Sequence, residues 1–338
     1  AANGNRAPNL IRFRTSSRRK TVSRSSNPTS RPDKIRVRIS RFDPGVDRTP
    51  RYDQFEVPFK PLMRIIDVLD YIHEDLAVDI GYRWLCTSKK CGSCAVKVNG
   101  SPALACWDEA LPEMTIEPLD NLPVVRDLVT SRDGYEAMLA KVSPLLMRKR
   151  DYPGFPEAIT EQDFAPTVHL RDCIQCLACQ SVCPVVAQKD SGFAGPAILV
   201  QLSDLAQDPR DEADRADLAD RVAQVFKCVS CYECERVCPS EIPIVSEAIE
   251  PLKRLVYRTG TSAGARRARA FLSVAEERGT VNGALVALRA GKFNLGTIRI
   301  GVRLMLRGKL NLIDALFGRR TSGSDALRRA HQASEKRP

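Results

Sequence analysis

The chain has 338 residues, of which 43% are hydrophobic, enough for two ordinary domains and too much for a generally disordered protein. No stretch approaches the roughly 18 consecutive apolar residues of a membrane-spanning helix, and no apolar segment follows the basic N-terminus as in a secretory signal. Twelve cysteines fall into three tight groups of four, which favours metal binding in a reducing compartment over six disulfides.

The formal net charge of +11 is unevenly distributed along the chain. Residues 1–32 carry eight basic and no acidic residues, and residues 251–338 carry nineteen basic and five acidic ones, which leaves the middle near −11. We interpret residues 1–32 as a basic arm of the mature protein; an organelle transit peptide is the alternative. The two basic ends predict contact with an anionic membrane surface, an acidic partner subunit or nucleic acid.

Residues 33–135 are predicted to form the first domain. Alternating apolar and charged residues in DKIRVRISRF predict a half-buried strand, which pairs across DPGVDRTP with a second strand in RYDQFEVPF. In the next segment Pro61 suits a first helical turn, and apolar residues follow at helical spacing: Leu62, Ile65, Ile66, Leu69, Ile72 and Leu76. His73, among acidic neighbours in this helix, is expected to be solvated.

The stretch CTSKKCGSCAVKVNGSPALAC has the C-x4-C-x2-C spacing of a plant-type 2Fe-2S site, with a distant fourth cysteine. Gly92 and Ser93 keep side-chain bulk low where backbone N–H groups must turn toward cluster sulfur. A hairpin turning at Asn99-Gly100 would return the last cysteine to the cluster. A structural zinc site is the alternative, but zinc sites commonly pair two C-x2-C knuckles. The predicted ligands are Cys86, Cys91, Cys94 and Cys106.

Residues 136–255 are predicted to form an all-helical domain, from segments such as AILVQLSDLAQD and DRADLADRVAQVF. It contains CIQCLACQSVCP and CVSCYECERVCP, two runs with the bacterial ferredoxin spacing C-x2-C-x2-C-x3-C-P, in which the fourth cysteine binds the other run's cluster. This rule predicts one 4Fe-4S cluster on Cys173, Cys176, Cys179 and Cys238, and a second on Cys183, Cys228, Cys231 and Cys234. Two zinc sites are the alternative. His169, just before the first run, is expected to be packed rather than a ligand.

Residues 256–338 are predicted to form a basic helical tail. Arg299, Arg303 and Arg307 recur every fourth residue and would form one stripe of a helix, near Ile298, Val302, Met305 and Leu306. Such a helix can lie on an anionic membrane, or it can pack on a partner with its arginines solvated. Nucleic acid is not an expected partner, because neither an aromatic stacking platform nor a groove-reading motif accompanies the stripe.

From Asp33 to Arg258, the cysteine pattern and the segment IIDVLDYI resemble the iron-sulfur subunit of succinate dehydrogenase and fumarate reductase, the complex II family. The resemblance implies an α+β chain, with a β-grasp ferredoxin domain followed by a helical two-cluster ferredoxin domain. It also implies electron passage between a flavoprotein subunit with covalent FAD and a membrane quinone, with no catalytic residue in this chain. We expect a peripheral position on the cytoplasmic side of the inner membrane.

Three departures separate the chain from common members of that family. Cys231 stands where those members lack a thiol and hold a 3Fe-4S cluster, so the second run should build a 4Fe-4S cluster of lower potential. In common members, a Trp shortly after the first CP run and a His directly after the next cysteine help form the quinone pocket. Here CPVVAQK lacks the Trp and Val229 stands in place of the His. Both changes resemble the branch of the family whose anchor has cysteine-rich CCG domains. The tail segment IGVRLMLRGKL also resembles subunits with such partners. Lys89 and Lys90 add positive charge that should favour the reduced 2Fe-2S form.

Two other functions stay open from the residues alone. One is the iron-sulfur subunit of another flavoprotein, such as a thiol-linked fumarate reductase. The other is a basic, zinc-stabilised nucleic-acid-binding protein. An absorption spectrum separates them, since broad brown iron-sulfur bands would support an electron carrier and a colourless zinc protein would not.

Overall fold

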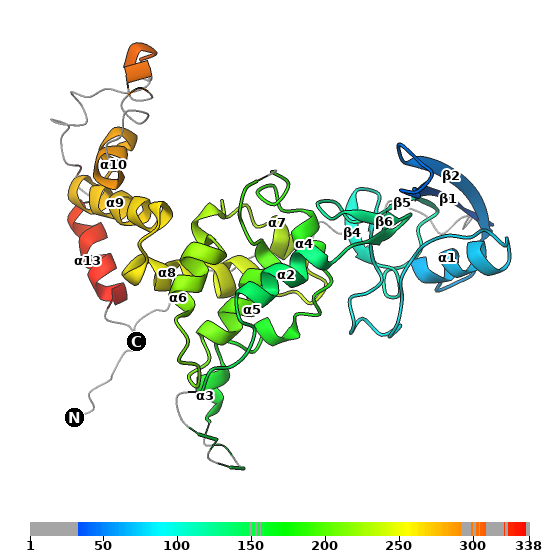
Figure 1. The fold of residues 1–338 in the computed structure, drawn as a ribbon, viewed down its shortest axis with the longest axis horizontal. Helices are drawn as coiled ribbons and strands as arrows, with labels where there is room; N and C mark the ends of the chain where they lie inside the picture. Colours follow the sequence, from blue (N-terminus) through cyan, green and yellow to red (C-terminus); the bar gives the residue numbers. More distant parts are fainter. Residues whose placement is uncertain are drawn as a thin grey trace, which may run out of the picture. The chain divides into compact units, whose positions relative to one another are not determined.

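The computed structural model describes residues 33–148 and 151–291, apart from Pro153, Pro156, Ala158 and Lys189, and further along residues 299, 302, 303, 305–308, 321 and 324–335. The expected basic arm, residues 1–32, lies outside the described residues, as does Ile298 of the tail. Helices and strands are labelled as in Figure 1.

Residues 34–117 contain a five-stranded sheet (Figure 1). In spatial order its strands are β2 (Arg51–Pro58), β1 (Lys34–Arg41), β5 (Glu113–Glu117), β3 (Ala95–Val98) and β4 (Ser101–Leu104). The predicted hairpin is confirmed: β1 and β2 are antiparallel, from Lys34 opposite Pro58 to Arg41 opposite Arg51. β1 also pairs in parallel with β5, so an early and a late strand together hold the centre of the sheet.

Helix α1 (Ile65–Glu74) supplies apolar side chains to the core of this sheet. Leu69 and Ile72 of the helix are fully buried in the same cluster as Ile35 and Ile39 of β1. Burial of a side chain of this size contributes about 1.5–3 kcal/mol, so the apolar face of α1 is what fixes it on the sheet.

The prediction that Pro61 occupies the first turn of this helix is wrong, because the helix begins at Ile65. Leu62 has a left-handed φ of 66° and is exposed. The Asp67 carboxylate accepts the N–H of Arg64 at 2.6 Å, which caps the helix at that residue. Leu76 lies beyond the other end and is also exposed, so the apolar period runs past the helix on both sides.

The predicted hairpin at Asn99-Gly100 is confirmed, and the φ values of 49° and 80° fit a type I′ turn. β3 begins one residue after Cys94, and β4 ends two residues before Cys106, so the hairpin brings these two cysteines together. A two-stranded sheet follows, formed by β6 (Val124–Arg126) and β7 (Val129–Thr130).

Helical segments replace strands from residue 133 onward. The α-helices up to residue 259 are α2 (Asp133–Lys141), α3 (Glu161–Phe164), α4 (Ala178–Ser181), α5 (Pro196–Ala206), α6 (Arg215–Asp217), α7 (Glu233–Arg236) and α8 (Glu250–Thr259). This part also contains the π-helices Leu218–Val222 and Ile244–Ile249 and the 3-10 helices Leu170–Asp172 and Val225–Lys227. The helix predicted from AILVQLSDLAQD is confirmed as α5.

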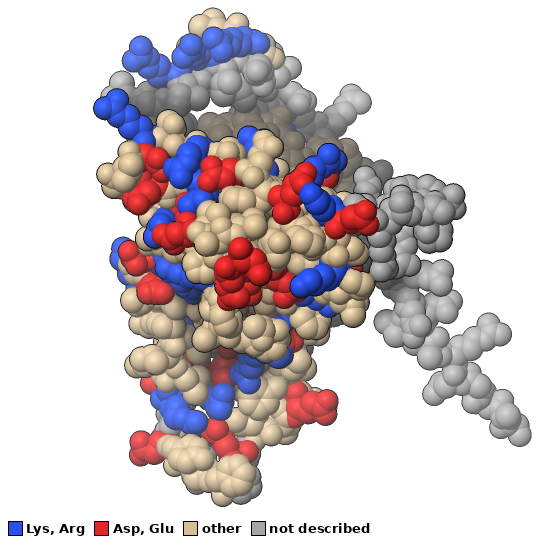
Figure 2. All heavy atoms as spheres, turned by 90° about the vertical axis from the view of Figure 1, so that its right-hand side faces the viewer, with Lys and Arg blue, Asp and Glu red and all other residues tan. Residues whose placement is uncertain are grey.

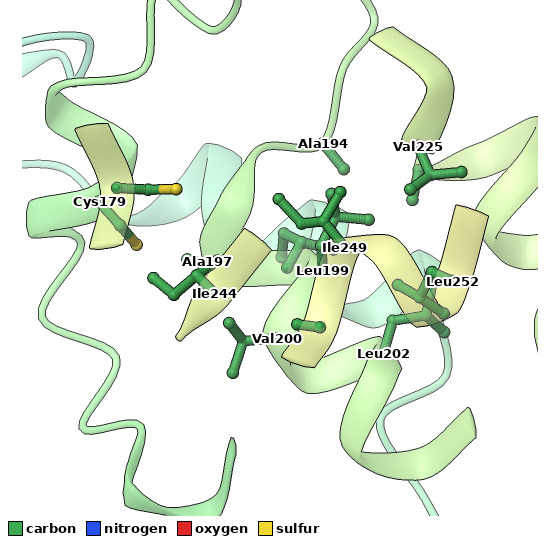
Figure 3. Packing of buried hydrophobic residues seen from close by; sticks show 14 of the residues in the cluster. Cys179, Ala194, Ala197, Leu199, Val200, Leu202, Val225, Ile244, Ile249 and Leu252 are labelled. Carbon is green, nitrogen blue, oxygen red and sulfur yellow. The ribbon is translucent and has the colours of Figure 1, made fainter. Parts of the chain in front are cut away.

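Helix α5 lies at the centre of the helical core (Figure 3). Its residues Leu199 and Leu202 are fully buried, and the helix packs against α8 and the π-helix that ends at Ile249. Cys179 belongs to the same buried cluster. The loops that carry the cysteines are therefore continuous with a packed interior, which holds them in place.

The described tail contains α9 (Ala263–Arg278), α10 (Gly283–Ala290) and α13 (Ser324–Glu335). α9 packs on both other helices and shares a small buried cluster with α10. Of the predicted stripe, Arg299 and Arg303 are helical and exposed, whereas Arg307 lies in a turn just after the helix. The apolar residues described beside them, Val302, Met305 and Leu306, are exposed as well.

Charges of both signs share the face of the molecule seen in Figure 2, where Lys and Arg are interspersed with Asp and Glu. On the sheet such charges pair directly, as Lys34 does with Glu56 and Arg36 with Glu113. Exposed pairs of this kind each contribute about 0–1 kcal/mol. In the described part of the chain, no helix combines the length and the hydrophobicity needed to cross a membrane.

Candidate metal centres

The first predicted ligand set lies on the loop before β3 and just after β4. The thiols of Cys86 and Cys91 are hydrogen-bonding neighbours, and Cys94 interacts with both Cys91 and Cys106. The N–H of Cys106 points to the sulfur of Cys94 at 3.5 Å. The structure therefore brings these four thiols together.

The loop wraps its backbone around the sulfur of Cys86. N–H groups of Ser88, Lys90 and Cys91 point to this sulfur at 3.5, 3.3 and 3.3 Å. These donors, that of Ser88 first, lower the pKa of the Cys86 thiol to about 6. A thiolate is the form that binds iron, so this arrangement fits the expectation that N–H groups turn toward sulfur here.

The two CP runs share one backbone conformation. Gln175 and Leu177 in the first run have left-handed φ values of 51° and 65°, and the matching Ser230 and Tyr232 in the second have 51° and 63°. Each run then enters a one-turn helix, α4 or α7. Left-handed non-glycine residues are uncommon, so their repetition indicates two copies of one binding loop.

Each predicted four-iron ligand set lines one cavity. The first cavity is lined by Cys173, Cys176 and Cys179 of the first run and by Cys238 of the second. The second cavity is lined by Cys228, Cys231, Cys234 and, from the first run, Cys183. Within the described ranges, no three His, Cys, Asp or Glu side chains lie close enough together to hold a single metal ion. What the chain offers at each place is a four-sulfur cavity with one cysteine exchanged between the runs.

The interior of the first cavity fits a bound cluster chemically. Burial raises the pKa of Cys176 to about 11, so an uncompensated thiol would stay protonated there, whereas a coordinating metal removes the proton outright. The hydroxyl of Tyr135 is buried without a hydrogen-bond partner among the described residues. Its pKa is raised by burial and then by the nearby Cys173, which puts an unused donor in the same region.

The second cavity lies nearer the surface than the first. Cys231 is exposed, and its neighbours Val229 and Tyr232 are 64% and 46% exposed. At the matching positions of the first run, Cys176 and Leu177 are buried. Of the two four-cysteine cavities, the second is therefore the more accessible from solvent.

Sequence reasoning missed a lysine at the second site. The ammonium of Lys253, on α8, lies 3.1 Å from the carbonyl oxygen of Cys228 and 3.1 Å from the hydroxyl of Ser230. It stands more than twenty residues from these loop partners, with no motif to mark it, and only the packing of α8 brings it to the loop.

The two histidines noted in the sequence are not placed alike. The prediction that His169 is packed is wrong: its side chain is 58% exposed, and its Nδ1 lies 2.8 Å from Oε2 of Glu247. The pair forms because the turn before the first run and the π-helix after the second face each other. His73 is exposed, as predicted, with Nδ1 3.3 Å from the carbonyl oxygen of Val78.

Large apolar side chains are exposed around the first ligand set. Trp84, Leu85 and Trp107 are 53%, 71% and 47% exposed. Lys89 places its ammonium 5.4 Å from the centre of the Trp107 ring. A surface that combines exposed tryptophan with a cation suits the docking of another protein.

Two family models match the chain. A 2Fe-2S iron-sulfur cluster binding domain matches residues 36–137, and a 4Fe-4S dicluster domain matches residues 169–242. The first span contains the plant-type cysteine set and nearly all of the sheet, and the second contains both CP runs and helices. Together they give a mixed α+β chain with two kinds of iron-sulfur domain.

Relatives and solved structures agree with these models. A fumarate reductase (CoM/CoB) subunit of Methanothermobacter marburgensis is 37% identical over 67% of this chain, which spans only 45% of that relative. The fumarate reductase iron-sulfur subunit of Mycobacterium tuberculosis is 35% identical over 49% of this chain and 70% of the relative. A chain of the Mycobacterium smegmatis Sdh1 complex in the apo form has a TM-score of 0.62 and 28% identity, over 67% of this chain and 96% of that one. The chain belongs to the family of fumarate reductase and succinate dehydrogenase iron-sulfur subunits.

Proposed function

We propose that this chain passes electrons between a FAD-containing flavoprotein subunit and a quinone-linked membrane anchor in a succinate dehydrogenase or fumarate reductase. The grouping of twelve cysteines into three sets of four, two of which each line one cavity, carries this proposal. Clusters bound there supply one-electron transfer. The dicarboxylate chemistry would then take place at the partner's flavin, and this chain contributes only thiolates and their surroundings.

The proposed cofactors are one 2Fe-2S cluster and two 4Fe-4S clusters. The first set, Cys86, Cys91, Cys94 and Cys106, would hold the two-iron cluster. The crossed sets would hold the others, with Cys231 completing the second because it lines that cavity with Cys228 and Cys234. We further propose that residues 33–135 form a β-grasp ferredoxin domain, residues 136–255 a two-cluster helical domain, and residues 256–338 a basic tail.

Two surfaces support entry and exit at opposite ends of the cluster series. The exposed Trp84 and Trp107 with Lys89 lie beside the first set and suit a flavoprotein partner. The exposed Val229 and Tyr232 lie beside the second four-iron set. Because Val229 stands where common family members have a quinone-pocket histidine, we assign the exit to a CCG-domain anchor rather than to quinone bound by this chain.

The proposed location is peripheral, on the cytoplasmic side of the inner membrane. Partner contacts would supply most of the attachment, and the exposed basic residues of the tail would add attraction to anionic lipid.

A thiol-linked fumarate reductase is the second candidate. The Methanothermobacter relative, named for CoM/CoB, favours it, since it matches 67% of this chain. The two candidates share the clusters and the flavoprotein and differ in where the electrons go after the second four-iron set.

The test is to isolate the native complex anaerobically, identify its subunits and measure its iron and its EPR spectra. We expect about ten irons per chain, distributed as one two-iron and two four-iron centres. Reduction by succinate and oxidation by a quinone analogue would support the first candidate, and reduction by thiols, or oxidation by the disulfide that those thiols form, would support the second. A colourless protein that binds zinc would refute both.

A further inference from the structure

The loop of the first ligand set touches the loop of the first CP run at Gly92. This glycine has a φ of +68°, and a Cβ added to it would lie 2.6 Å from the carbonyl oxygen of Ile174. The same Cβ would lie 2.8 Å from Cα and 2.9 Å from Cβ of Cys176. Real Cβ atoms do not approach other atoms this closely, so the backbone of Gly92 lies directly against a residue of the first four-iron set.

The packing around this contact joins the two parts of the chain. Cys176 and Ala178 of the helical region are buried in the apolar cluster of the sheet, together with Cys94 and Cys106. The two proposed centres are thus continuous through packed atoms, without a solvent layer between them at this point.

Two hydrogen bonds from residues that follow the sheet also hold the first CP run at this junction. The guanidinium of Arg132 donates to the carbonyl oxygen of Gln175 at 2.9 Å, one residue before Cys176. The amide of Asn121 donates to the carbonyl oxygen of Ser181 at 2.8 Å, at the end of α4. These two residues fix the first run against the sheet domain without belonging to either cysteine loop.

A polar cavity of about 240 Å³ lies beside the contact. It is lined by both loops, including Cys91, Gly92, Cys176 and Leu177, and by the arginines Arg83 and Arg132. Water fills polar cavities of this size, so a path across it would leave the packed protein. The direct contact at Gly92 is, by contrast, a route through packed atoms.

We propose that the contact between Gly92 and Cys176 is the junction through which electrons pass between the two-iron and the first four-iron centre, and that Gly92 is a positioning residue there. The proposal rests on the proposed electron-transfer function. One electron moves, so one centre is oxidised as the other is reduced, and no bond or proton changes place. Because the rate of electron tunnelling falls steeply with the gap, any side chain at position 92 would slow the step by separating the loops.

The test compares Gly92→Ala with Gly100→Ala in the intact complex. Gly100 has a similar φ of +80°, but nothing lies within 4 Å of a Cβ added there, so both variants strain the backbone and only one pushes on the other loop. We expect both to keep the iron content of the wild type. Only Gly92→Ala should weaken the magnetic interaction between the two reduced centres in EPR and slow the transfer between them in rapid-freeze experiments. An interaction and a rate equal to those of Gly100→Ala would overturn the proposal.

A second pair of variants covers the case in which Gly92→Ala fails to retain its two-iron centre. Asn121→Ala and Arg132→Met loosen the junction from outside the cysteine loops, and each should weaken the same magnetic interaction at full iron content. Unchanged interaction in both would overturn the proposal. Failure of the electron-transfer function itself looks different, because the wild-type complex would then lack the iron-sulfur EPR signals altogether.

Discussion

At the scale of single residues, the two CP runs differ in solvent exposure at equivalent positions. Leu177 is 2% exposed, whereas Tyr232, at the same place in the second loop, is 46% exposed. Solvent exposure and hydrogen bonds to sulfur are among the factors that set the potential of an iron-sulfur cluster. The two four-iron centres should therefore differ in potential although their ligands and loop geometry are alike.

Cys231→Val tests the fourth ligand of the second centre. With three thiols left at that cavity, iron should fall from about ten to about nine per chain, and a 3Fe-4S signal should appear in the oxidised protein. The potential of this centre should rise. Val229→Ala, an exposed neighbour in the same loop, is the control and should change neither iron nor spectrum. If Cys231→Val kept ten irons and its original EPR spectrum, Cys231 would not be a ligand.

Lys253→Met tests the lysine that contacts the loop of the second centre. Removing its positive charge should make the potential of this centre more negative, because a nearby cation favours the reduced form. An EPR-monitored redox titration measures the shift. The control is Arg254→Met, whose side chain is 77% exposed and faces Glu250 rather than the loop. Equal potentials in the two variants would mean that the Lys253 contact is structural only.

The sequence groups the cysteines by spacing within short stretches, and the rule for paired ferredoxins predicts the exchanged fourth cysteine. The structure places each crossed group around one cavity, and their role as ligands stays a prediction. The sequence does not predict Asn121, Arg132 or Lys253, because their partners lie more than twenty residues away and no local pattern marks them. The sequence explains Gly92 only by the need for low side-chain bulk where the loop's own N–H groups turn toward sulfur. The contact with Cys176 adds a reason that only the packing of two distant loops reveals.

At the scale of elements, the apolar sequence pattern fails to predict where a helix begins and ends. The apolar period of α1 includes Leu62 and Leu76, yet both lie outside the helix and are exposed. Periodicity reports only which residues could share a face. The Asp67 carboxylate accepts the backbone N–H of Arg64 and so caps the helix there, and Leu62, with its left-handed φ, lies before that start.

Arg215 joins two elements of the helical domain from inside the protein. Its side chain is 2% exposed, lies 2.7 Å from Asp211, and donates to the carbonyl oxygens of Val142, Ser143 and Leu145 after α2. All three guanidinium nitrogens of Arg215 donate hydrogen bonds to these acceptors. A buried charge is tolerated when its hydrogen bonds are satisfied in this way.

Arg215→Met should lower the free energy of unfolding by about 3–5 kcal/mol, because it leaves Asp211 as an uncompensated buried charge. Arg221→Met is a matched control: Arg221 also pairs with an aspartate four residues earlier, but it is 67% exposed, so its loss should cost about 0–1 kcal/mol. Denaturant unfolding of anaerobic, fully loaded protein, followed by circular dichroism, measures both. Equal costs would show that burial of the Arg215 pair does not decide its contribution.

At the scale of the whole molecule, the charge is unevenly distributed along the sequence. The middle of the chain, which holds the proposed clusters, has a formal charge near −11, and the two ends are basic. In the described tail, exposed arginines lie next to exposed apolar residues, Val302, Met305 and Leu306. This combination is typical of helices that lie in a membrane interface.

Reversing the charge at Arg299, Arg303 and Arg307 to Glu tests whether this segment meets anionic lipid. Each basic residue at such a surface contributes about 1 kcal/mol, so the triple variant should bind vesicles containing phosphatidylserine about a hundredfold or more less tightly. Moderate salt should weaken the wild type in the same direction, because charges are screened over roughly 8–10 Å. The control variant carries Glu at Arg328 and Arg329, exposed residues of α13, and should bind more tightly than the triple variant. Both variants should keep their full iron content, since the reversed residues lie outside the cysteine cavities. If the triple variant bound vesicles like the wild type, the tail would serve a protein partner and not the membrane. If the triple variant lost iron, the tail would belong to the ferredoxin core.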